Sequence, residues 1–168
     1  LKRKLVSWAD RLMKRSSVET KKAPPPVGPY SQAIQAGNMV FVSGQIALHP
    51  ETNEIPEDFT TQCHQVLKNL QAILEASGSS LEHTVKVMIY MTDIDRFNEL
   101  NEIYAGYLGS AKPARACVEV SRLPKGVLVE MDAVALIEEW CWFGTAGIEN
   151  SLFLGSLSLP EAEKFGVA

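Results

Sequence analysis

The sequence predicts one α+β domain in which two helices cover one face of a sheet. Apolar runs typical of strands occupy residues 30–46, 85–91 and 114–135. Residues 59–74 and 97–108 instead carry apolar side chains at helical spacing. The resulting order is β-β-α-β-α-β-β, and it contains more hairpins than crossovers, which favours an α+β layer arrangement over a doubly wound sheet.

Length and composition fit a globular domain with extensions. The chain has 168 residues, of which 46% are hydrophobic, so it can bury a core. Residues 1–22 carry eight Lys/Arg and two acids (+6), and the rest carries eight and eighteen (−10), giving the net charge of −4. A body this acidic argues against phosphate-backbone binding, so no nucleic-acid partner is expected. No uninterrupted apolar run is long enough for a membrane helix.

The cysteines and histidines indicate neither a disulfide framework nor a metal site. Cys63, Cys117 and Cys141 are too few and too scattered for disulfides, which suggests a reducing compartment. The three histidines show no metal-ligand spacing with them. We therefore expect no structural or catalytic metal.

The basic segment 1–22 has two interpretations. Four apolar residues lie at helical spacing beside Lys and Arg, a pattern that resembles a mitochondrial presequence. Asp10 and Glu19 weigh against a presequence, and a solvated arm fits the same residues equally well. Residues 23–26 (APPP) are expected to form a stiff spacer that separates this arm from a domain at 23–137.

The first predicted strands form a hairpin. Gly37 and Asn38 tolerate positive φ and separate two apolar runs, which is a hairpin signal. Residues 39–42 are mostly apolar, so the second strand is expected to be buried on both faces. Gly44 follows in that strand, where the absence of a side chain allows close approach by a ligand or a neighbouring chain.

Each predicted helix has one apolar stripe. The first stripe consists of Phe59, Cys63, Val66, Leu67, Leu70, Ile73 and Leu74. The second consists of Phe97, Leu100, Tyr104 and Leu108, after a cap at Asp93 or Asp95. Asn101 lies on the second stripe, where a buried amide needs a polar partner, and a loop carbonyl would serve as well as a ligand.

Residues 112–135 are the clearest site candidate. Strand alternation places Arg115 and Cys117 on one face of the first run, and Glu130 and Asp132 on one face of the second. A guanidinium, a thiol and two carboxylates could therefore meet within one short span. The alternative for Arg115 is an ion pair, with Glu119 or Glu130, that only joins strands.

Two regions lie outside this pattern. The sheet face opposite the helices needs cover that the remaining elements are too few to provide, so self-association is expected. Residues 138–168 contain apolar side chains interrupted by glycines and show no period. This extension could dock on the domain, bind a partner or stay disordered.

Several motifs in consistent order and spacing resemble the reactive intermediate deaminase A (RidA) family. They are VGPYSQ (27–32), SGQI (43–46) and PARACVEV (113–120), followed by LPK (123–125) and VE (129–130). The resemblance covers roughly residues 23–137 and implies a chorismate-mutase-like fold, with two helices on one sheet face. It also implies a homotrimer with clefts between subunits.

The activity implied by the resemblance is hydrolysis of 2-imino or 2-enamino acids, such as 2-iminobutanoate and 2-iminopropanoate, to 2-keto acids and ammonia. No cofactor is implied, and the expected location is the cytoplasm or the mitochondrial matrix. Relatives have also been linked to chaperone-like and translation-inhibiting ribonuclease activities. A non-catalytic ligand-binding or interaction role is therefore the alternative.

Carried onto matching positions, the resemblance assigns a role to each site residue. Arg115 would clamp the substrate carboxylate, and Glu130 would position and deprotonate water. The substrate-binding residues would be Tyr30, Ser43, Gly44, Asn101 and Cys117, with Arg115. Asp132 stands where many members have Glu, a shorter arm with the same charge.

The residues themselves suit this chemistry. The planar guanidinium of Arg115 donates two parallel hydrogen bonds to a carboxylate. Burial should raise the pKa of Glu130, whereas Arg115 nearby should lower it, which would leave a base active near neutral pH. No His in the motif could activate Cys117, and imine hydrolysis needs no covalent step, so Cys117 is expected to be a pocket wall.

Overall fold

The structure, a computed structural model, describes residues 15–137. Its strands are β1 (Arg15–Val18), β2 (Ala33–Ala36), β3 (Met39–Ile46), β4 (Thr84–Met91), β5 (Ala114–Glu119) and β6 (Val129–Leu136). Its α-helices are α2 (Phe59–Ala76) and α3 (Phe97–Leu108), with short 3₁₀ turns at Leu81–His83, Ile94–Arg96 and Pro124–Gly126. The predictions for residues 1–14 and 138–168 lie outside the described residues.

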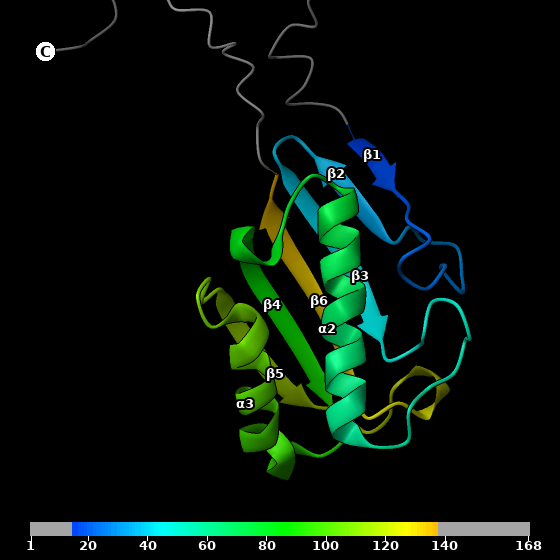
Figure 1. Ribbon diagram of the computed structural model, residues 1–168, viewed down its shortest axis with the longest axis vertical. Coiled ribbons are helices and arrows are strands. Elements are labelled where there is room, and N and C mark those ends of the chain that lie inside the picture. The colour runs from blue at the N-terminus through cyan, green and yellow to red at the C-terminus, as the bar shows by residue number, and fades with distance from the viewer. Residues whose placement is uncertain (1–14, 138–168) are drawn as a thin grey trace, which may run out of the picture.

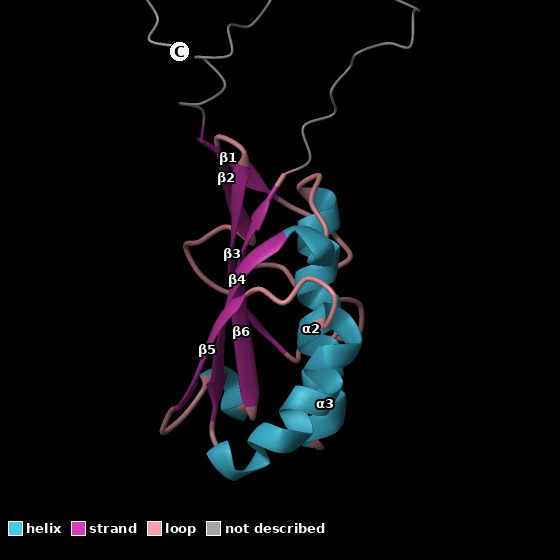
Figure 2. Cartoon of the chain, turned by 90° about the vertical axis from the view of Figure 1, so that its left-hand side faces the viewer, coloured by secondary structure: helices cyan, strands magenta, loops and turns pink. Residues whose placement is uncertain are grey.

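The six strands form one mixed sheet in the order β1-β2-β3-β6-β4-β5 (Figure 1). All neighbours are antiparallel except β4 and β5, which are parallel. Both helices pack on the same side, as the edge-on view in Figure 2 shows. We call this side the helix face and the other the open face. The predicted α+β class is confirmed.

Helix α2 forms where its apolar stripe can cover the middle of the sheet. The stripe residues are buried in the same core cluster as Val40, Ile89 and Met131. Asp58 caps the helix, because its side chain accepts a hydrogen bond of 2.8 Å from the Thr61 N–H. At the other end, the hydroxyl of Ser77 donates to carbonyls of the last turn.

We expect Asp58→Ala to lower the melting temperature at pH 7, since an alanine leaves the Thr61 N–H without its cap. The bond from Thr61 lowers the pKa of Asp58, so its stabilising effect is present above the ordinary carboxyl pKa and is lost as the pH falls through the lowered value. Thermal melts at pH 7 and pH 3 measure this loss. Asp58→Asn is the control, because asparagine also caps, and an equal melting temperature for the Ala and Asn variants would contradict the account.

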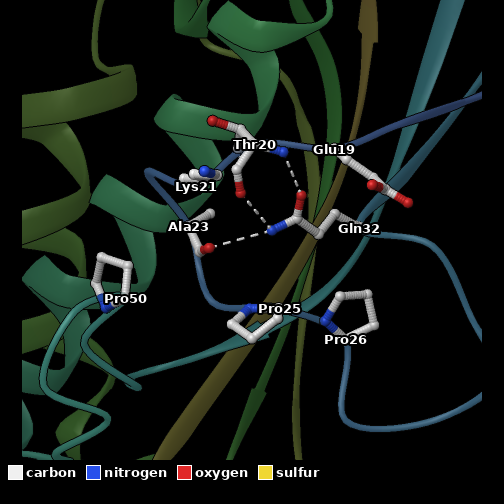
Figure 3. Close-up of a pocket in the computed structure, with 8 residues that line it drawn as sticks. All are labelled: Glu19, Thr20, Lys21, Ala23, Pro25, Pro26, Gln32 and Pro50. Carbon is white, nitrogen blue, oxygen red and sulfur yellow. Dashed lines mark hydrogen bonds between the residues drawn. The ribbon is translucent and has the colours of Figure 1, made fainter.

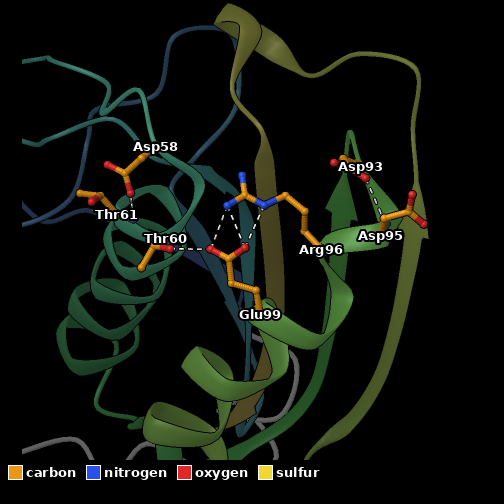
Figure 4. Close-up of polar contacts among 7 residues, drawn as sticks. All are labelled: Asp58, Thr60, Thr61, Asp93, Asp95, Arg96 and Glu99. Atoms are coloured by element: carbon orange, nitrogen blue, oxygen red, sulfur yellow. Dashed lines mark hydrogen bonds and ion pairs between the residues drawn. The ribbon is translucent and has the colours of Figure 1, made fainter.

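A polar tie joins the first turns of α2 and α3 (Figure 4). The guanidinium of Arg96 donates two hydrogen bonds of 2.9 Å to the Glu99 carboxylate, which also accepts one from the Thr60 hydroxyl. The same guanidinium lies 4.3 Å from the centre of the Phe59 ring. Asp93 does act as a cap, but it caps the 3₁₀ turn before α3 rather than α3 itself.

The structure describes residues on both sides of the predicted boundary at residue 22. Residues 15–18 form β1, which pairs with β2 and extends the sheet. Ala23 and Pro24 are buried, so the proline-rich segment packs on the domain and is no spacer. Gln32, only 1% exposed, holds it by donating to the carbonyls of Thr20, Ala23 and Pro24 while accepting from the Thr20 N–H. Thr20, Ala23 and Gln32 are among the residues that line a cavity of about 560 Å³ beside β1 (Figure 3).

The open face carries exposed apolar side chains. Val40 and Val42 of β3 are buried under the helices, whereas Phe41 between them is 45% exposed. The expectation that residues 39–42 are buried on both faces is therefore wrong. Val118 of β5 and Leu136 of β6 are also exposed, and within residues 15–137 no element covers them. A broad apolar sheet face of this kind is typical of an interaction surface.

Candidate functional site

The structure places Arg115 and Cys117 on the helix face of the edge strand β5. Their partners on β4, Val87 and Ile89, are buried in the core, and paired residues of neighbouring strands share a face. The Arg115 guanidinium lies over α3, 4.8 Å from the centre of the Tyr104 ring and 5.3 Å from that of Phe97. The thiol of Cys117 lies 3.4 Å from the Met91 sulfur.

Glu130 and Asp132 project from β6 on the open face. They alternate with Val129, Met131 and Ala133, which are buried beneath the helices. The Tyr90 hydroxyl donates a hydrogen bond of 3.2 Å to the Asp132 carboxylate.

The prediction that the guanidinium, the thiol and both carboxylates meet within one chain is therefore wrong. The two runs are not neighbours, because β4 lies between β5 and β6 and each run keeps its own alternation. The alternative, an ion pair of Arg115 with Glu119 or Glu130, is also not found: within residues 15–137 the ion pair joins Arg96 and Glu99.

Glu130 rests against the backbone of Gly44. The β3–β6 register shifts between Val42 and Gln45, so Ser43 and Gly44 form an irregularity in the ladder. A Cβ atom added at Gly44 would overlap the Glu130 carboxylate oxygen. The Ser43 hydroxyl donates a 2.7 Å bond to the Ser31 carbonyl, which ties this irregularity to the segment before β2. Glycine is thus required at 44 for the carboxylate to lie where it does.

Tyr30 lies beside the group formed by Ser43, Gly44 and Glu130. Its hydroxyl accepts a 3.3 Å bond from the Val27 N–H, and its ring is 48% exposed. A small hollow of about 30 Å³ is lined by residues of the segment before β2, including Tyr30, and by residues of β3, including Gly44 and Ile46. Tyr30, Ser43, Gly44 and Glu130 therefore form one group of predicted site residues, which we call the Glu130 half.

Arg115, Cys117 and Asn101 form a second group, which we call the Arg115 half. Asn101 is half-buried on α3, four residues after Phe97 and three before Tyr104. This spacing places Asn101 on the same face of α3 as the two rings over which the guanidinium lies. The predicted loop-carbonyl partner is not found, because no hydrogen bond of the Asn101 amide occurs within residues 15–137.

Burial dominates the electrostatics of the Glu130 half. It raises the pKa of Glu130, and the neighbouring negative charge of Asp132 raises it further. Burial likewise raises the pKa of Asp132, opposed by the Tyr90 hydrogen bond and by Lys86. The expected lowering of the Glu130 pKa by Arg115 is absent within one chain. In the Arg115 half, burial raises the pKa of the Cys117 thiol, and Arg115 partly opposes this, so the thiol is not activated.

Two further properties limit what this part of the chain can do. Among residues 15–137, no three His, Cys, Asp or Glu side chains are grouped so that they could hold a metal ion. No helix among them is sufficiently long and apolar to cross a membrane.

Comparison with known proteins identifies the class. The model of the family Endoribonuclease L-PSP matches residues 20–137. A RutC family protein of Pyrococcus abyssi is 52% identical over 127 residues, which is 75% of this chain and all of that protein.

Solved structures agree with this match. The structure of E. coli TdcF with bound serine superposes with a TM-score of 0.70 at 40% identity, covering 73% of this chain and 99% of that one. Yeast Mmf1 gives a TM-score of 0.72 at 40% identity, covering 74% of this chain and all of Mmf1. The chain belongs to the Endoribonuclease L-PSP family. This membership confirms the predicted RidA-like resemblance at the level of the family, in which relatives such as the Pyrococcus abyssi protein are named RutC family proteins.

Proposed function

We propose that the chain hydrolyses reactive 2-imino and 2-enamino acids to 2-keto acids and ammonia, at a site assembled between copies of itself. One observation carries the proposal. Among residues 15–137, a guanidinium without an acidic partner on the helix face and a desolvated carboxylate on the open face each form half of a site that these residues of one copy do not complete.

Arg115 is the carboxylate-binding half. Within residues 15–137 it has no acidic partner, and its guanidinium lies against two aromatic rings. An unpaired guanidinium presents a planar fork of donors that matches a carboxylate. The structure of E. coli TdcF contains bound serine, and serine carries such a carboxylate.

Glu130 is the water-activating half. Its raised pKa makes it a stronger proton acceptor than an ordinary carboxylate. Gly44 leaves the carboxylate room at the surface of the β3–β6 pair. Asp132 is engaged by Tyr90, so of these two carboxylates Glu130 is the one free to hold water.

Self-association would bring the two halves together. They occupy different surfaces, so a contact that joins the Arg115 half of one copy to the Glu130 half of the next is head-to-tail. Such contacts form a ring when the rotation between copies closes, and a homotrimer is a ring of this kind. The apolar open face, with Phe41, Val118 and Leu136, supplies a surface for that contact.

The reaction follows from the two groups. Arg115 holds the carboxylate, and Glu130 takes a proton from water as its oxygen attacks the C2 carbon of the C=N bond. Glu130 returns this proton to the nitrogen, which completes the carbinolamine. Glu130 then takes the proton of the carbinolamine hydroxyl as the C=O bond forms and passes it to the departing nitrogen, which leaves as ammonia. A positioned base contributes about 10²–10⁴ in rate. Burial of the Cys117 thiol supports its role as a wall rather than a nucleophile.

The test is a coupled assay in which an amino-acid-eliminating enzyme generates 2-iminobutanoate or 2-aminoacrylate and loss of the imine is followed. Wild-type protein should accelerate the loss, and its mass in solution should be three times 18.5 kDa. An unchanged rate with wild-type protein would contradict the proposal. If the same protein bound 2-oxobutanoate without turnover, the non-catalytic alternative would hold instead.

Gly44→Ala tests the position of the Glu130 carboxylate. The added methyl group overlaps the end of a flexible side chain, so the carboxylate should move while the fold keeps its stability. We expect kcat/KM to fall by about tenfold or more, the range of a misplaced catalytic group. Gly106→Ala, an exposed position on α3 with open space around its Cβ, is the control. Equal activity of the two variants would show that Gly44 does not position Glu130.

RNA cleavage is the second candidate, because the matching family model is described as Endoribonuclease L-PSP. The acidic body and the separation of the histidines count against it. His64 lies between α2 and α3, bonded to the Tyr107 hydroxyl, and His49 accepts N–H bonds within its own loop. A labelled RNA incubated with purified protein distinguishes the two activities. The location of the protein in the cytoplasm or the mitochondrial matrix stays a prediction.

A further inference from the structure

Within the described part of the chain, residues 15–137, the Arg115 guanidinium contacts aromatic rings and forms no ion pair with an acid. The ring of Tyr104 lies 4.8 Å from it and the ring of Phe97 lies 5.3 Å away, both on α3. We call these two rings the aromatic seat. Attraction between a cation and the face of an aromatic ring operates within about 6 Å, so both rings contribute. A seat of this kind fixes the cation without occupying its hydrogen-bond donors.

Tyr104 is the more firmly held of the two rings. It is 8% exposed, whereas Phe97 is half-buried at the start of the helix. Its hydroxyl oxygen is buried with no hydrogen-bond partner among residues 15–137. A buried unpaired hydroxyl destabilises a fold, so the hydroxyl is not what this position contributes to stability.

We propose that Tyr104 is a positioning residue for carboxylate binding, acting through the face of its ring on Arg115. This inference rests on the proposed function for one point only, the identity of the ligand as a small 2-keto or 2-imino acid. Contacts between a cation and ring faces use none of the guanidinium N–H donors, so these donors can still bind a carboxylate. Without the ring, the long Arg115 side chain on an edge strand would sample other rotamers, and ordering it would oppose binding.

The chain offers variants that separate the ring from the hydroxyl. Tyr104→Phe keeps the ring and removes the unpaired hydroxyl, whereas Tyr104→Leu removes the ring. Tyr107→Leu is the matched control, because Tyr107 lies on the same helix but contacts His64 of α2 instead of Arg115. It removes an equally large ring without touching the seat.

The experiment is NMR of arginine side chains in the full protein, titrated with 2-oxobutanoate. The Arg115 Nε–Hε signal, identified by its loss in Arg115→Lys, should be shifted by ring currents in the wild type, in Tyr104→Phe and in Tyr107→Leu. Tyr104→Leu should lose the part of that shift that the Tyr104 ring causes, and its Kd for 2-oxobutanoate should rise by about three- to tenfold, as expected for loss of a partly desolvated cation–π contact. Tyr104→Phe should bind as the wild type does and melt at a higher temperature.

Two results would overturn the proposal. An unchanged Kd in Tyr104→Leu would show that the seat does not serve binding. An equal loss in Tyr104→Phe and Tyr104→Leu would assign the effect to the hydroxyl. This test is separate from that of the proposed function. A wild-type protein that bound 2-oxobutanoate through Arg115 yet left imines intact would contradict the proposed hydrolysis, but it would not contradict the role of Tyr104 in carboxylate binding.

Discussion

Arg115→Ala should lower kcat/KM for 2-iminobutanoate by about 10²–10⁴-fold, as expected when two charge-assisted hydrogen bonds to a carboxylate are lost. The physical reason is specific to this site. The guanidinium has no acidic partner within residues 15–137, so its fork is available to a ligand. The coupled imine assay measures the effect, and the loss should be mainly in KM if the clamp binds ground state and transition state alike.

Arg115→Lys separates charge from geometry. Lysine keeps the positive charge but presents a point donor that cannot bind a carboxylate in the bidentate mode. We expect it to recover only a small part of the lost activity. Because Arg115 forms no ion pair with any residue between 15 and 137, neither variant should unfold the protein, and circular dichroism checks this. Wild-type activity in Arg115→Ala would show that Arg115 does not bind the substrate carboxylate.

Glu130→Gln should lower kcat by about 10²–10⁴-fold, the contribution of a positioned general base. Glutamine fills the same space beside Gly44 and can still hold water, but it cannot accept the proton. Asp132→Asn is the control, since Asp132 shares the face of Glu130 but is engaged by the Tyr90 hydroxyl. A loss in Asp132→Asn as large as that in Glu130→Gln would show that the base is misassigned.

The raised pKa of Glu130 also fixes the direction of the pH dependence. The base acts when ionised, so activity should rise with pH through a value above that of an ordinary glutamate, and burial against a second copy would move that value higher still. Because the folded pKa exceeds the unfolded one, the stabilisation by the bound proton is complete below the ordinary pKa and is lost as the pH rises through the raised one. Glu130→Gln should therefore raise the melting temperature at pH 7.

Most of the fold could be predicted from residue patterns. The apolar stripe of α2 and the turn at Gly37 both depend on local spacing, and both are where the sequence places them. β1 was missed because Arg15–Val18 has only four residues and becomes a strand by pairing with β2. The burial of Ala23 and Pro24 was missed because it depends on the distant side chain of Gln32.

The site could be predicted as a set of residues but not as an arrangement. The alternation of side chains within a strand is a local property. It correctly predicts that Arg115 and Cys117 share one face of β5 and that Glu130 and Asp132 share one face of β6. Which of the pairs faces the helices depends on β4, which lies between the two strands and is distant in sequence. The sequence contains one signal for the aromatic seat, because Phe97 and Tyr104 lie seven residues apart on one apolar stripe. That spacing, however, predicts packing in the core as readily as it predicts a contact with Arg115.

Subunit complementation is the most direct test of a site shared between copies. Arg115→Ala and Glu130→Gln proteins are mixed in equal amounts, unfolded, refolded together and assayed for imine hydrolysis, beside each variant refolded alone. If each site takes Arg115 from one copy and Glu130 from its neighbour, random mixing restores both groups in about a quarter of the sites of a closed ring. The account predicts about that fraction of wild-type activity; a mixture no more active than either variant alone would contradict it.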